Sequence, residues 1–571
     1  MSKYILGIHE GHNASVCLIN DNQVIYATQE ERHSNIKNHS GFPESSVEQA
    51  LKYCGINKED IDYVALAGHH IPNPDSVFRG LYKKQALRKG KAIVNLLMKS
   101  PIYNAYKATR KKKRIDTIAD FGFNRKRIRF VEHHLCHASA AYFALPTPKD
   151  KKVLVLTLDG SGDGLCSTVN IALDGEINRI AATDKGDSVG NIYSRVTFLL
   201  GFKPWEHEYK LMGMAPYVSE TGQDIGYEIF KNYIDIDFDN PLKFKRKISE
   251  PTTLIYKRLR RDTELVRFDN ICAGLQKMTE DVVCRWVDTC IRKTGIETVA
   301  LSGGVFMNVK VNKKIMELES VKDLYILPSC GDETNSIGAA YHVYHDEFNK
   351  KDGQVPTPLS SLYLGNDTEN NQCLKAIEEY ISRGYQLTYE KYDNIEIEIA
   401  KMIAERNVVA RCNGRMEFGA RALGNRSILA DPSDLSLLNK INLSVKKRDF
   451  WMPFAPVILK ERAGEYIKNP KNVESPHMIL SFDTTDKYKE FLGGVHQADH
   501  TARAQVIEKE ANPEYYTILK EFERITGRGV LLNTSFNLHG YPIVCQPEDA
   551  LWVLVNSELN FLALGDYLVR C

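Results

Sequence analysis

Residues 151–184, KKVLVLTLDGSGDGLCSTVNIALDGEINRIAATD, decide the fold of this chain. Apolar runs alternate with turn signals at DGSGDG and LDGE, so the stretch predicts three strands joined by two tight turns. Residues 3–32, KYILGIHEGHNASVCLINDNQVIYATQEER, repeat this plan with turns at EGHN and NDNQ. Two copies of one three-stranded meander, about 150 residues apart, indicate a weak internal repeat.

A repeated meander is the layout of a duplicated ribonuclease-H-like fold, in which two lobes hold a nucleotide between their first hairpins. Two helices are predicted between and after the meanders, at 42–55 and 268–295, and each ends at a glycine. We therefore expect an α/β protein whose N-terminal domain has the duplicated fold of the actin and sugar-kinase superfamily.

The length of 571 residues exceeds one typical core and predicts two or three domains. The polar stretch KDGQVPTPLS at 351–360 carries two prolines, so we place a boundary there, between domains 1–352 and 353–571. The second domain is predicted to be mixed α/β. A strongly basic stretch at 83–128 reads either as a solvated insertion or as a surface for an acidic partner or anionic lipid.

Composition indicates an ordinary globular protein in a reducing compartment. The formal net charge of +2 gives no push toward nucleic acid, which we do not expect as a partner. The first residues predict a buried strand rather than a signal peptide, and no apolar run approaches the roughly 20 residues of a transmembrane span. The 12 cysteines are scattered without a CxxC pair, which favours reduced thiols and a cytoplasmic location.

A candidate metal site begins in the stretch VEHHLCHASAAY. His133 and His137 are spaced i and i+4, so on a helix they face the same way and can share one ion. Asp159 and Asp332 each follow a predicted strand and supply oxygen ligands. Two nitrogen and two oxygen ligands suit Fe2+, Mn2+ or Zn2+. The alternatives are histidines that only pack or cap a helix, and an Asp332 that caps the helix after it.

Glycines near these ligands predict a phosphate cradle, since backbone N–H groups approach a phosphate most closely where side chains are absent. Gly160 and Gly162 lie in the first turn, and Gly303 and Gly304 follow the strand TVALS. Turns of this type are more often simple hairpins. Lys210 is a candidate clamp for a triphosphate, or a surface lysine.

The first hairpin turn, GIHEGHNAS, carries a candidate general base. His12 can take a proton from an attacking hydroxyl near neutral pH, and Glu10 is a carboxylate that could orient it. The alternative is a histidine bonded within its own turn.

The second half contains a cluster of arginines interleaved with glycines in VVARCNGRMEFGARALGNRS, at 408–427. Arginine forks bind phosphate bidentately, and glycine lets the backbone close around a small anion. The candidate anion ligands here and downstream are Arg415, Arg421, Lys446 and Arg448.

Five motifs of the first half, in this order, resemble the O-carbamoyltransferase family: HHLCHA, LDGSGDG, EYKLMGMAPY, SGGVFMN and LPSCGDETNSIGAA. That family modifies nodulation factors, aminoglycosides and cephem antibiotics. The same half resembles the metal-and-ATP domain of the tRNA threonylcarbamoyl-transfer proteins. In the second half, GRMEFGARALGNRS, DHTARAQ and LLNTSFN resemble the family's C-terminal domain, whose fold is like that of the YrdC-type synthases.

The resemblance implies further site residues. Asn308 resembles the family's nucleoside contact, and Arg32 and Lys37 match a basic pair near the acceptor and nucleotide site. Arg503, Asn533, Thr534 and Ser535 match segments that bind carbamoyl phosphate. The resemblance also favours iron as the metal, with Mg2+ possible beside ATP.

The implied reaction has two steps. Carbamoyl phosphate would be cleaved in the second domain to carbamate, which attacks the α-phosphate of ATP in the first to give carbamoyl-adenylate. A hydroxyl of a sugar, glycan or natural product would then take the carbamoyl group. The remaining hypotheses are a phosphotransferase of the sugar-kinase and acetate-kinase superfamily, and a non-catalytic nucleotide-binding subunit.

Three departures from the family pattern concern the anion site. Met452 stands where many members have Arg, and Ala420 stands where many have Pro. After NTSFN the chain reads LHGYP, in place of a basic residue followed by Gly-Glu-Pro. Fewer cations weaken phosphate binding unless another group, such as His539, compensates.

Overall fold

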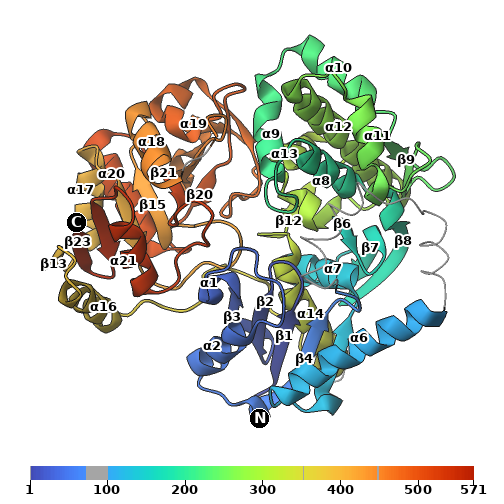
Figure 1. The fold of residues 1–571 in the computed structure, drawn as a ribbon, viewed down its shortest axis with the longest axis horizontal. Coiled ribbons are helices and arrows are strands. Elements are labelled where there is room, and N and C mark those ends of the chain that lie inside the picture. The colour runs from blue at the N-terminus through green and yellow to red at the C-terminus, as the bar shows by residue number, and fades with distance from the viewer. Residues whose placement is uncertain (1, 72–100, 351–352, 447–448) are drawn as a thin grey trace. The chain divides into compact units, whose positions relative to one another are not determined.

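The structure is a computed structural model that describes residues 2–71, 101–350, 353–446 and 449–571. The chain divides into two compact units, each built from several segments (Figure 1). Unit 1 comprises Met1–Glu30, Asn38–Leu211 and Val218–Ser360, and unit 2 comprises Glu31–Lys37, Met212–Tyr217 and Ser361–Cys571.

Unit 1 contains two five-stranded sheets with the same strand order. In the first sheet the order is β3-β2-β1-β4-β5: β1 to β3 form an antiparallel meander, and β4 and β5 continue it in parallel with β1. In the second sheet the order is β8-β7-β6-β11-β12, again an antiparallel meander extended by two parallel strands. The strands are β1 (Tyr4–His9), β2 (Ser15–Asn20), β3 (Gln23–Gln29), β4 (Ile61–Ala67), β5 (Ile128–Val131), β6 (Val153–Gly162), β7 (Leu165–Leu173), β8 (Glu176–Asp184), β11 (Thr298–Ser302) and β12 (Asp323–Ile326).

This repeated topology confirms the predicted duplicated ribonuclease-H-like fold. The two predicted helices also form, as α2 (Glu44–Cys54) and α12 (Phe268–Thr294). Each ends at a glycine in the left-handed conformation, Gly55 and Gly295, which leaves their N–H groups bonded to the last turns.

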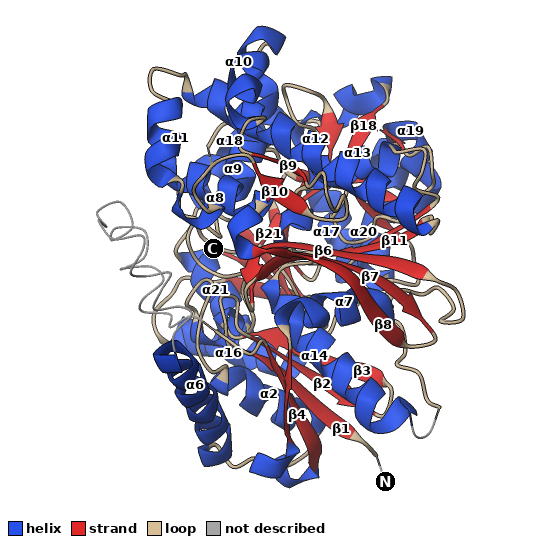
Figure 2. Ribbon diagram, turned by 90° about the vertical axis from the view of Figure 1, so that its right-hand side faces the viewer, coloured by secondary structure: helices blue, strands red, loops and turns tan. Residues whose placement is uncertain are grey.

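The last helix of each repeat packs on the sheet of the other repeat. Helix α7 (His133–Ala144) follows β5 but lies on β6 and β11, and α14 (Asn335–Tyr344) follows β12 but lies on β1, β2 and β4 (Figure 2). The two helices also contact each other. At their crossing a Cβ on Gly338 would stand 1.9 Å from the carbonyl oxygen of Cys136, so only glycine fits there. Both repeats therefore meet at the start of these helices.

The remaining helices and strands of unit 1 surround this core. Helix α13 (Val309–Glu317) follows β11, and α8 (Val189–Leu199) follows β8. Helix α9 (Glu208–Met214) runs from unit 1 into the short segment that belongs to unit 2. The others are α6 (Pro101–Asp120), α10 (Glu220–Phe230), α11 (Tyr256–Asp262), β9 (Ile234–Ile236) and β10 (Phe244–Arg246).

Unit 2 is mixed α/β, as expected, around an eight-stranded sheet. Its strand order is β13-β23-β22-β14-β15-β21-β16-β20, and a small sheet β17-β18-β19 lies apart from it. The strands are β13 (Thr388–Lys391), β14 (Val409–Cys412), β15 (Arg426–Ala430), β16 (Ala455–Leu459), β17 (Ile467–Lys468), β18 (Phe482–Thr484), β19 (Thr501–Ala502), β20 (Gln505–Ile507), β21 (Val530–Ser535), β22 (Phe561–Leu564) and β23 (Tyr567–Arg570).

Helices cover both faces of the eight-stranded sheet, so its central strands are apolar on both sides. Ile428 of β15 belongs to one hydrophobic cluster, whereas its neighbour Leu429 belongs to the other. This alternation follows from the two-residue period of a strand. The helices are α1 (Glu31–Ser34), α16 (Asn370–Ser382), α17 (Ile395–Ala404), α18 (Leu435–Ile441), α19 (Ala463–Tyr466), α20 (Pro513–Thr526) and α21 (Pro547–Val555).

The structure also bears on two predictions from composition, the absence of transmembrane spans and the reduced state of the cysteines. No helix within the described ranges combines the length and apolarity required to cross a bilayer. All 12 cysteines are free thiols.

Candidate metal and nucleotide site

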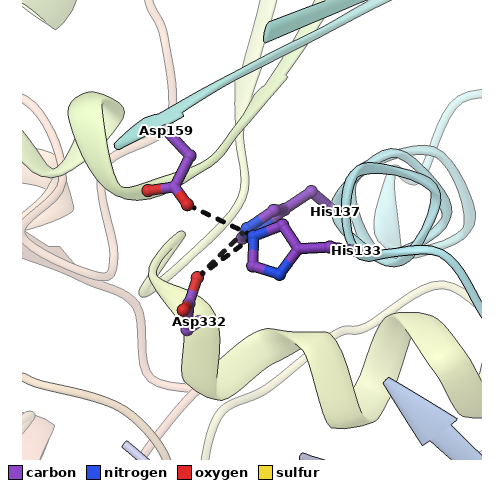
Figure 3. Close-up of side chains that lie close together, drawn as sticks. All are labelled: His133, His137, Asp159 and Asp332. Carbon is purple, nitrogen blue, oxygen red and sulfur yellow. Dashed lines mark hydrogen bonds and ion pairs between the residues drawn. The ribbon is translucent and has the colours of Figure 1, made fainter. Parts of the chain in front are cut away.

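The structure brings the four predicted metal ligands together where the two repeats meet (Figure 3). His133 and His137 project from the first turns of α7, Asp159 from β6 and Asp332 from the turn before α14. Their ligand atoms all lie within 4.8 Å of one another. Nε2 of His133 lies 3.2 Å from Oδ2 of Asp159 and 3.5 Å from Oδ1 of Asp332. Both histidines are buried, and the two carboxylates are partly exposed.

Asp332 does not act as a helix cap. It is the first residue of a short 3-10 turn, Asp332–Thr334, and the preceding Gly331 occupies the cap position. Its carboxylate faces the imidazoles instead, with Oδ1 3.4 Å from Nε2 of His137. Of the two alternatives for Asp332, the structure therefore favours the ligand position.

A neighbouring hydroxyl orients the ring of His137. Its Nδ1 lies 3.1 Å from Oγ of Ser302, at the end of β11. A bond at Nδ1 leaves Nε2 directed at Asp332, which is the arrangement expected of an imidazole ligand supported by a second group.

Asp163 is a positioning residue that the sequence interpretation missed. Its carboxylate accepts the backbone N–H of His133 at 2.9 Å, and those of His69 and His70 at 2.8 and 2.7 Å. It therefore ties the start of α7 to the segment after β4. The local sequence gives no signal for these contacts, because His69, His70 and His133 are all at least 30 residues from Asp163 along the chain.

The four side chains form a compact cluster of opposite charges. Burial lowers the pKa of His133, but Asp332 and Asp159 outweigh burial and raise that pKa to about 10. Burial works to raise the pKa of Asp332, but the imidazoles hold it well below its usual range. The pKa of Asp159 is also lowered, since His133 outweighs burial and the repulsion from Asp332. The carboxylates are thus ionised at neutral pH.

This donor set fits a divalent transition metal. Two imidazole nitrogens and two ionised carboxylates converge on one point, and their charges neutralise a divalent cation. His134, between the two candidate ligands, is held elsewhere: its Nδ1 lies 2.8 Å from Oγ1 of Thr157.

The predicted cradle glycines lie close to these ligands. A Cβ on Gly162 would stand 2.0 Å from the ring of His133, and a Cβ on Gly304 would stand 2.9 Å from Oδ1 of Asp159. Gly303 has φ of +111° and leaves no space for a Cβ beside the Leu158 carbonyl. Gly160 is less confined, since its nearest neighbour would be 3.8 Å away. Packing therefore requires glycine at positions 162 and 303, whereas at Gly304 only the end of the Asp159 side chain would have to move.

Helix α8 begins beside the same turn, which the sequence interpretation did not anticipate. Ser188 caps the helix, and its hydroxyl also donates to the carbonyl of Gly160 at 2.8 Å. A Cβ on Gly190 would stand 2.9 Å from both the carbonyl oxygen of Asp159 and the backbone nitrogen of Gly160. A helix N-terminus at this position adds a favourable site for negative charge.

The other predicted nucleotide residues have structural partners. The side chain of Asn308 caps α13 and exchanges hydrogen bonds with Gln276 at 2.9 and 3.1 Å. Lys210 is half-buried on α9, and its ammonium lies 5.2 Å from the ring centroid of Phe202. Both residues belong to unit 1.

The predicted pair of His12 and Glu10 is arranged differently from the expectation. Glu10 is buried against Arg114 of α6, whose Nε donates to it at 2.5 Å. Nε2 of His12 instead lies 3.2 Å from the carbonyl oxygen of Trp205. A guanidinium is a stronger hydrogen-bond partner for a carboxylate than a neutral imidazole, so Glu10 pairs with Arg114 rather than with His12.

The basic pair implied by the family resemblance belongs to unit 2. Lys37 is half-buried at the end of the segment Glu31–Lys37. Arg32 is buried and donates to the carbonyl of Gly419 at 2.6 Å. Arg32 thus anchors this short segment within unit 2.

In unit 2 the arginine cluster divides into structural and candidate binding residues. Arg411 and Arg426 are fully buried. Arg411 bonds Glu514 at 2.8 Å, and Arg426 donates to four backbone carbonyls and to Thr368. Arg415 is half-buried and donates to the carbonyl of Leu364 at 2.8 Å. Two of the four clustered arginines, Arg411 and Arg426, therefore stabilise the fold of unit 2 rather than being available to bind an anion.

Glu417 shapes the loop that carries this cluster. One of its oxygens accepts the backbone N–H groups of Leu423, Asn425 and Arg426 at 2.7, 2.8 and 3.2 Å. The loop is thereby held by a buried carboxylate rather than by regular secondary structure.

Of the remaining predicted anion ligands, Asn533, Thr534 and Ser535 belong to β21, and Lys446 contacts the end of that strand. The ammonium of Lys446 is buried and bonds the side-chain oxygens of Ser535 and Asn537 at 3.1 and 2.8 Å. Asn533 is buried and donates to Gln505 at 3.0 Å. Thr534 is buried, Arg421 and Arg503 are half-buried, and Arg448 lies outside the described residues, as does part of the basic stretch 83–128.

Of the departures from the family pattern, only Met452 has a structural explanation among the described residues. Met452 is half-buried, and its sulfur would lie 3.1 Å from a Cβ on Gly213, so it fills space. Ala420 and His539 are exposed.

Two family models match the chain, and together they span most of it. The carbamoyltransferase N-terminus matches residues 4–341 and the carbamoyltransferase C-terminus matches residues 400–571. An uncharacterized protein of Methanocaldococcus jannaschii is 33% identical over 99% of each chain. The nodulation protein NolNO of Sinorhizobium fredii is 30% identical over 98% of this chain and 79% of its own.

Similarity to solved structures is weaker. Component A of the Acidaminococcus fermentans (R)-2-hydroxyglutaryl-CoA dehydratase aligns over 60% of this chain and 98% of its own, with 15% identity and a TM-score of 0.31. T. kodakarensis HypF aligns over 61% of this chain and 48% of its own, with 12% identity and a TM-score of 0.34. The strand order of unit 1 is the stronger indication of the fold.

Proposed function

The chain belongs to the carbamoyltransferase family, and from this membership we propose that it is an ATP-dependent O-carbamoyltransferase. Carbamoyl phosphate, water and ATP would give a carbamoyl-adenylate, phosphate and pyrophosphate. A hydroxyl of a small-molecule or sugar acceptor would then take the carbamoyl group and release AMP. The observation that carries this proposal is the convergence of His133, His137, Asp159 and Asp332 beside glycine-rich backbone.

Unit 1 would carry the adenylation and transfer steps. His133, His137, Asp159 and Asp332 would hold the metal, Fe2+ or alternatively Mn2+ or Zn2+. When bound, the ion would offset negative charge on the phosphates of ATP.

The nucleotide would be held by backbone and two side chains of the same unit. The N–H groups near Gly160, Gly162, Gly303 and Gly304, with the start of α8, would face the phosphates. Lys210 and Asn308 would contact the triphosphate and the nucleoside.

Transfer requires a base for the acceptor. The acceptor oxygen would attack the carbamoyl carbon while its proton passes to His12, and the bond to AMP would break. Lys37 matches a basic residue that the family pattern assigns to the acceptor and nucleotide site. Glu10 forms an ion pair with Arg114 at 2.5 Å, so it is better described as the partner of Arg114 than as a partner of His12.

Unit 2 would cleave carbamoyl phosphate to carbamate and phosphate. The proposed ligands are Arg415, Arg421, Lys446, Arg448, Arg503, Asn533, Thr534 and Ser535. An arginine fork or ammonium stabilises the leaving phosphate. Carbamate decomposes in water, so a route that excludes water would prevent its loss.

The test is incubation with ATP, labelled carbamoyl phosphate and either Fe2+ or Mg2+, without acceptor. Pyrophosphate release that depends on carbamoyl phosphate is expected, and its absence under several metals would overturn the proposal. Formation of ADP instead would identify a phosphotransferase. A screen for products heavier by one carbamoyl group would then find the acceptor.

Variants separate catalysis from binding. His137→Ala is expected to abolish pyrophosphate release. His342→Gln is the matched control, because His342 lies on α14 and pairs with Asp346 at 3.3 Å, away from the four ligands. Unchanged biological output in a His133→Ala/His137→Ala variant would instead favour a non-catalytic nucleotide-binding subunit.

A further inference from the structure

The ring of His12 is held by the backbone of Trp205. Nε2 of His12 lies 3.2 Å from the carbonyl oxygen of Trp205, and the two rings meet edge to face with centroids 5.8 Å apart. The backbone of His12 is fixed independently, by a bridge to Ser40. The carbonyl of Trp205 therefore sets the direction of the ring.

This contact determines which ring nitrogen of neutral His12 carries the proton. A carbonyl oxygen can only accept a hydrogen bond, so the hydrogen must be on Nε2. Nδ1 then keeps the lone pair. If His12 acts as a base, Nδ1 is the atom that receives the proton.

Trp205 holds its carbonyl there in a strained conformation. Its φ is +65°, in the left-handed region that bulky residues rarely occupy. It lies in the loop between α8 and α9. A free loop would relax to negative φ, which would turn the carbonyl of Trp205 away from His12.

Glu208 supplies the restraint. Its Oε1 accepts the backbone N–H of Trp205 at 2.7 Å, and it is the first residue of α9. Burial raises the pKa of Glu208 to about 7, although hydrogen bonds from Trp205 and Ser194 act in the opposite direction. A carboxyl group is thus kept in an unfavourable environment where it bonds one strained peptide.

We propose that Glu208 is a positioning residue that holds the Trp205 peptide in its left-handed conformation and thereby fixes His12 as the Nε2–H tautomer. The path runs from the Glu208 carboxylate to the Trp205 N–H, and from the Trp205 carbonyl to Nε2 of His12. The catalytic meaning of this arrangement rests on the proposed function, in which His12 is the base. The role of Glu208 in fixing the Trp205 peptide and the His12 tautomer does not depend on the proposed function.

Histidine-selective 15N labelling tests the geometry in the full chain without any substrate. The His12 signal is assigned by its loss in His12→Gln. At a pH where His12 is neutral, the wild-type ring should carry its proton on Nε2, and exchange of that proton with water should be slow. A proton on Nδ1, or an Nε2 proton that exchanges as fast as in an exposed histidine, overturns the proposal.

Variants at Glu208 test the restraint. In Glu208→Ala the exchange should accelerate roughly tenfold, which is the change in population that a left-handed penalty corresponds to. Glu208→Gln should stay close to wild type, because its amide oxygen still accepts the Trp205 N–H. Glu206→Gln is the control, since Glu206 pairs with Lys203. Unchanged exchange in Glu208→Ala overturns the proposal.

A pair of variants at Trp205 keeps the test valid if Glu208→Ala does not fold. Trp205→Gly and Trp205→Val both remove the indole ring but keep the carbonyl. Glycine adopts positive φ freely, whereas valine does not. Slow exchange should persist in the glycine variant and be lost in the valine variant. Equal exchange rates in the two would show that backbone conformation is irrelevant.

Kinetics then connects the geometry to catalysis. In Glu208→Ala, kcat for carbamoyl transfer should fall about tenfold while KM for ATP is unchanged, and Glu208→Gln should restore kcat. If wild-type protein transfers no carbamoyl group, the proposed function fails, but the proton-exchange results still decide the role of Glu208. If transfer occurs and kcat is unaffected in Glu208→Ala, the positioning role fails alone.

Discussion

Oδ1 of Asp332 lies 3.4 Å from Nε2 of His137, and this contact joins the last helix of one repeat to the turn before the last helix of the other. We expect Asp332→Asn, which keeps the shape but removes the charge, to lower metal affinity more than roughly tenfold. Competition against a chromogenic chelator measures this. Asp323→Asn, at the start of β12, is the control and should bind metal normally. If Asp332→Asn and Asp323→Asn bound the metal with equal affinity, Asp332 would be excluded as a ligand.

Metal uptake should release a proton near neutral pH. The pKa of His133 is raised to about 10, so at pH 7 the metal-free imidazole is protonated, whereas a ligand imidazole is neutral. Calorimetric titration with Zn2+ in buffers of different ionisation enthalpy should report release of about one proton per ion. His133→Gln should bind more weakly and release less. No proton release from wild type would contradict the charge state assigned to His133.

The metal-free protein should lose stability as the pH rises above neutrality. Because the folded pKa of His133, about 10, exceeds the unfolded value of 6.5, its contribution is fully present below pH 6.5 and is lost as the pH approaches 10. The loss should be on the order of a few kcal/mol. Urea midpoints for unit 1 between pH 6.5 and 9.5, with chelator present, check this. In His133→Gln the decline should be smaller.

Gly162→Ala should displace the ring of His133. The added Cβ would stand 2.0 Å from that ring, so either the ring or the turn must move. We expect weaker metal binding and a stability loss of about 1–3 kcal/mol. Gly160→Ala, in the same turn, is the matched control, because its nearest neighbour would be 3.8 Å away. The prediction fails if both variants bind metal as the wild type does.

Arg426→Ala and Arg421→Ala should have different effects. Arg426 is fully buried and donates to backbone carbonyls and to Thr368, so its loss should destabilise unit 2 by about 3–5 kcal/mol, the cost of leaving buried groups unpaired. Arg421 is half-buried, and its removal should mainly weaken binding of carbamoyl phosphate. Thermal unfolding and equilibrium binding distinguish the two. Similar stability losses in both variants would contradict this division.

The sequence predicts the repeated meander well, because the period of apolar residues and the turn residues are local properties. The strand orders of the two sheets of unit 1 confirm it. The reciprocal packing of α7 and α14 has no such signal. Both helices are apolar on most faces, so periodicity does not indicate which sheet each one covers.

The site shows the same division between local and long-range information. The spacing of His133 and His137 shows that they can share an ion, but spacing alone is more typical of histidines that pack or cap a helix. The positions of Asp159 and Asp332 after strands, together with the neighbouring motifs, favour the metal site. The partners of Glu10 and His12 could not be predicted, since Arg114 and Trp205 are distant in sequence. Arg411 and Arg426 resemble anion ligands until their burial is known, and burial is a property of the completed fold.

The assignment of residues to the two units has a consequence for inheritance. The chain passes from one unit to the other after Glu30, Lys37, Leu211, Tyr217 and Ser360, so unit 2 includes two short segments encoded within the N-terminal half. A single recombination event near residue 360 would join a C-terminal part from one lineage to segments from another. Arg32, which donates to the carbonyl of Gly419, would then meet a foreign loop. Exchange of the N-terminal and C-terminal halves between relatives is therefore constrained, and the two halves are expected to descend together.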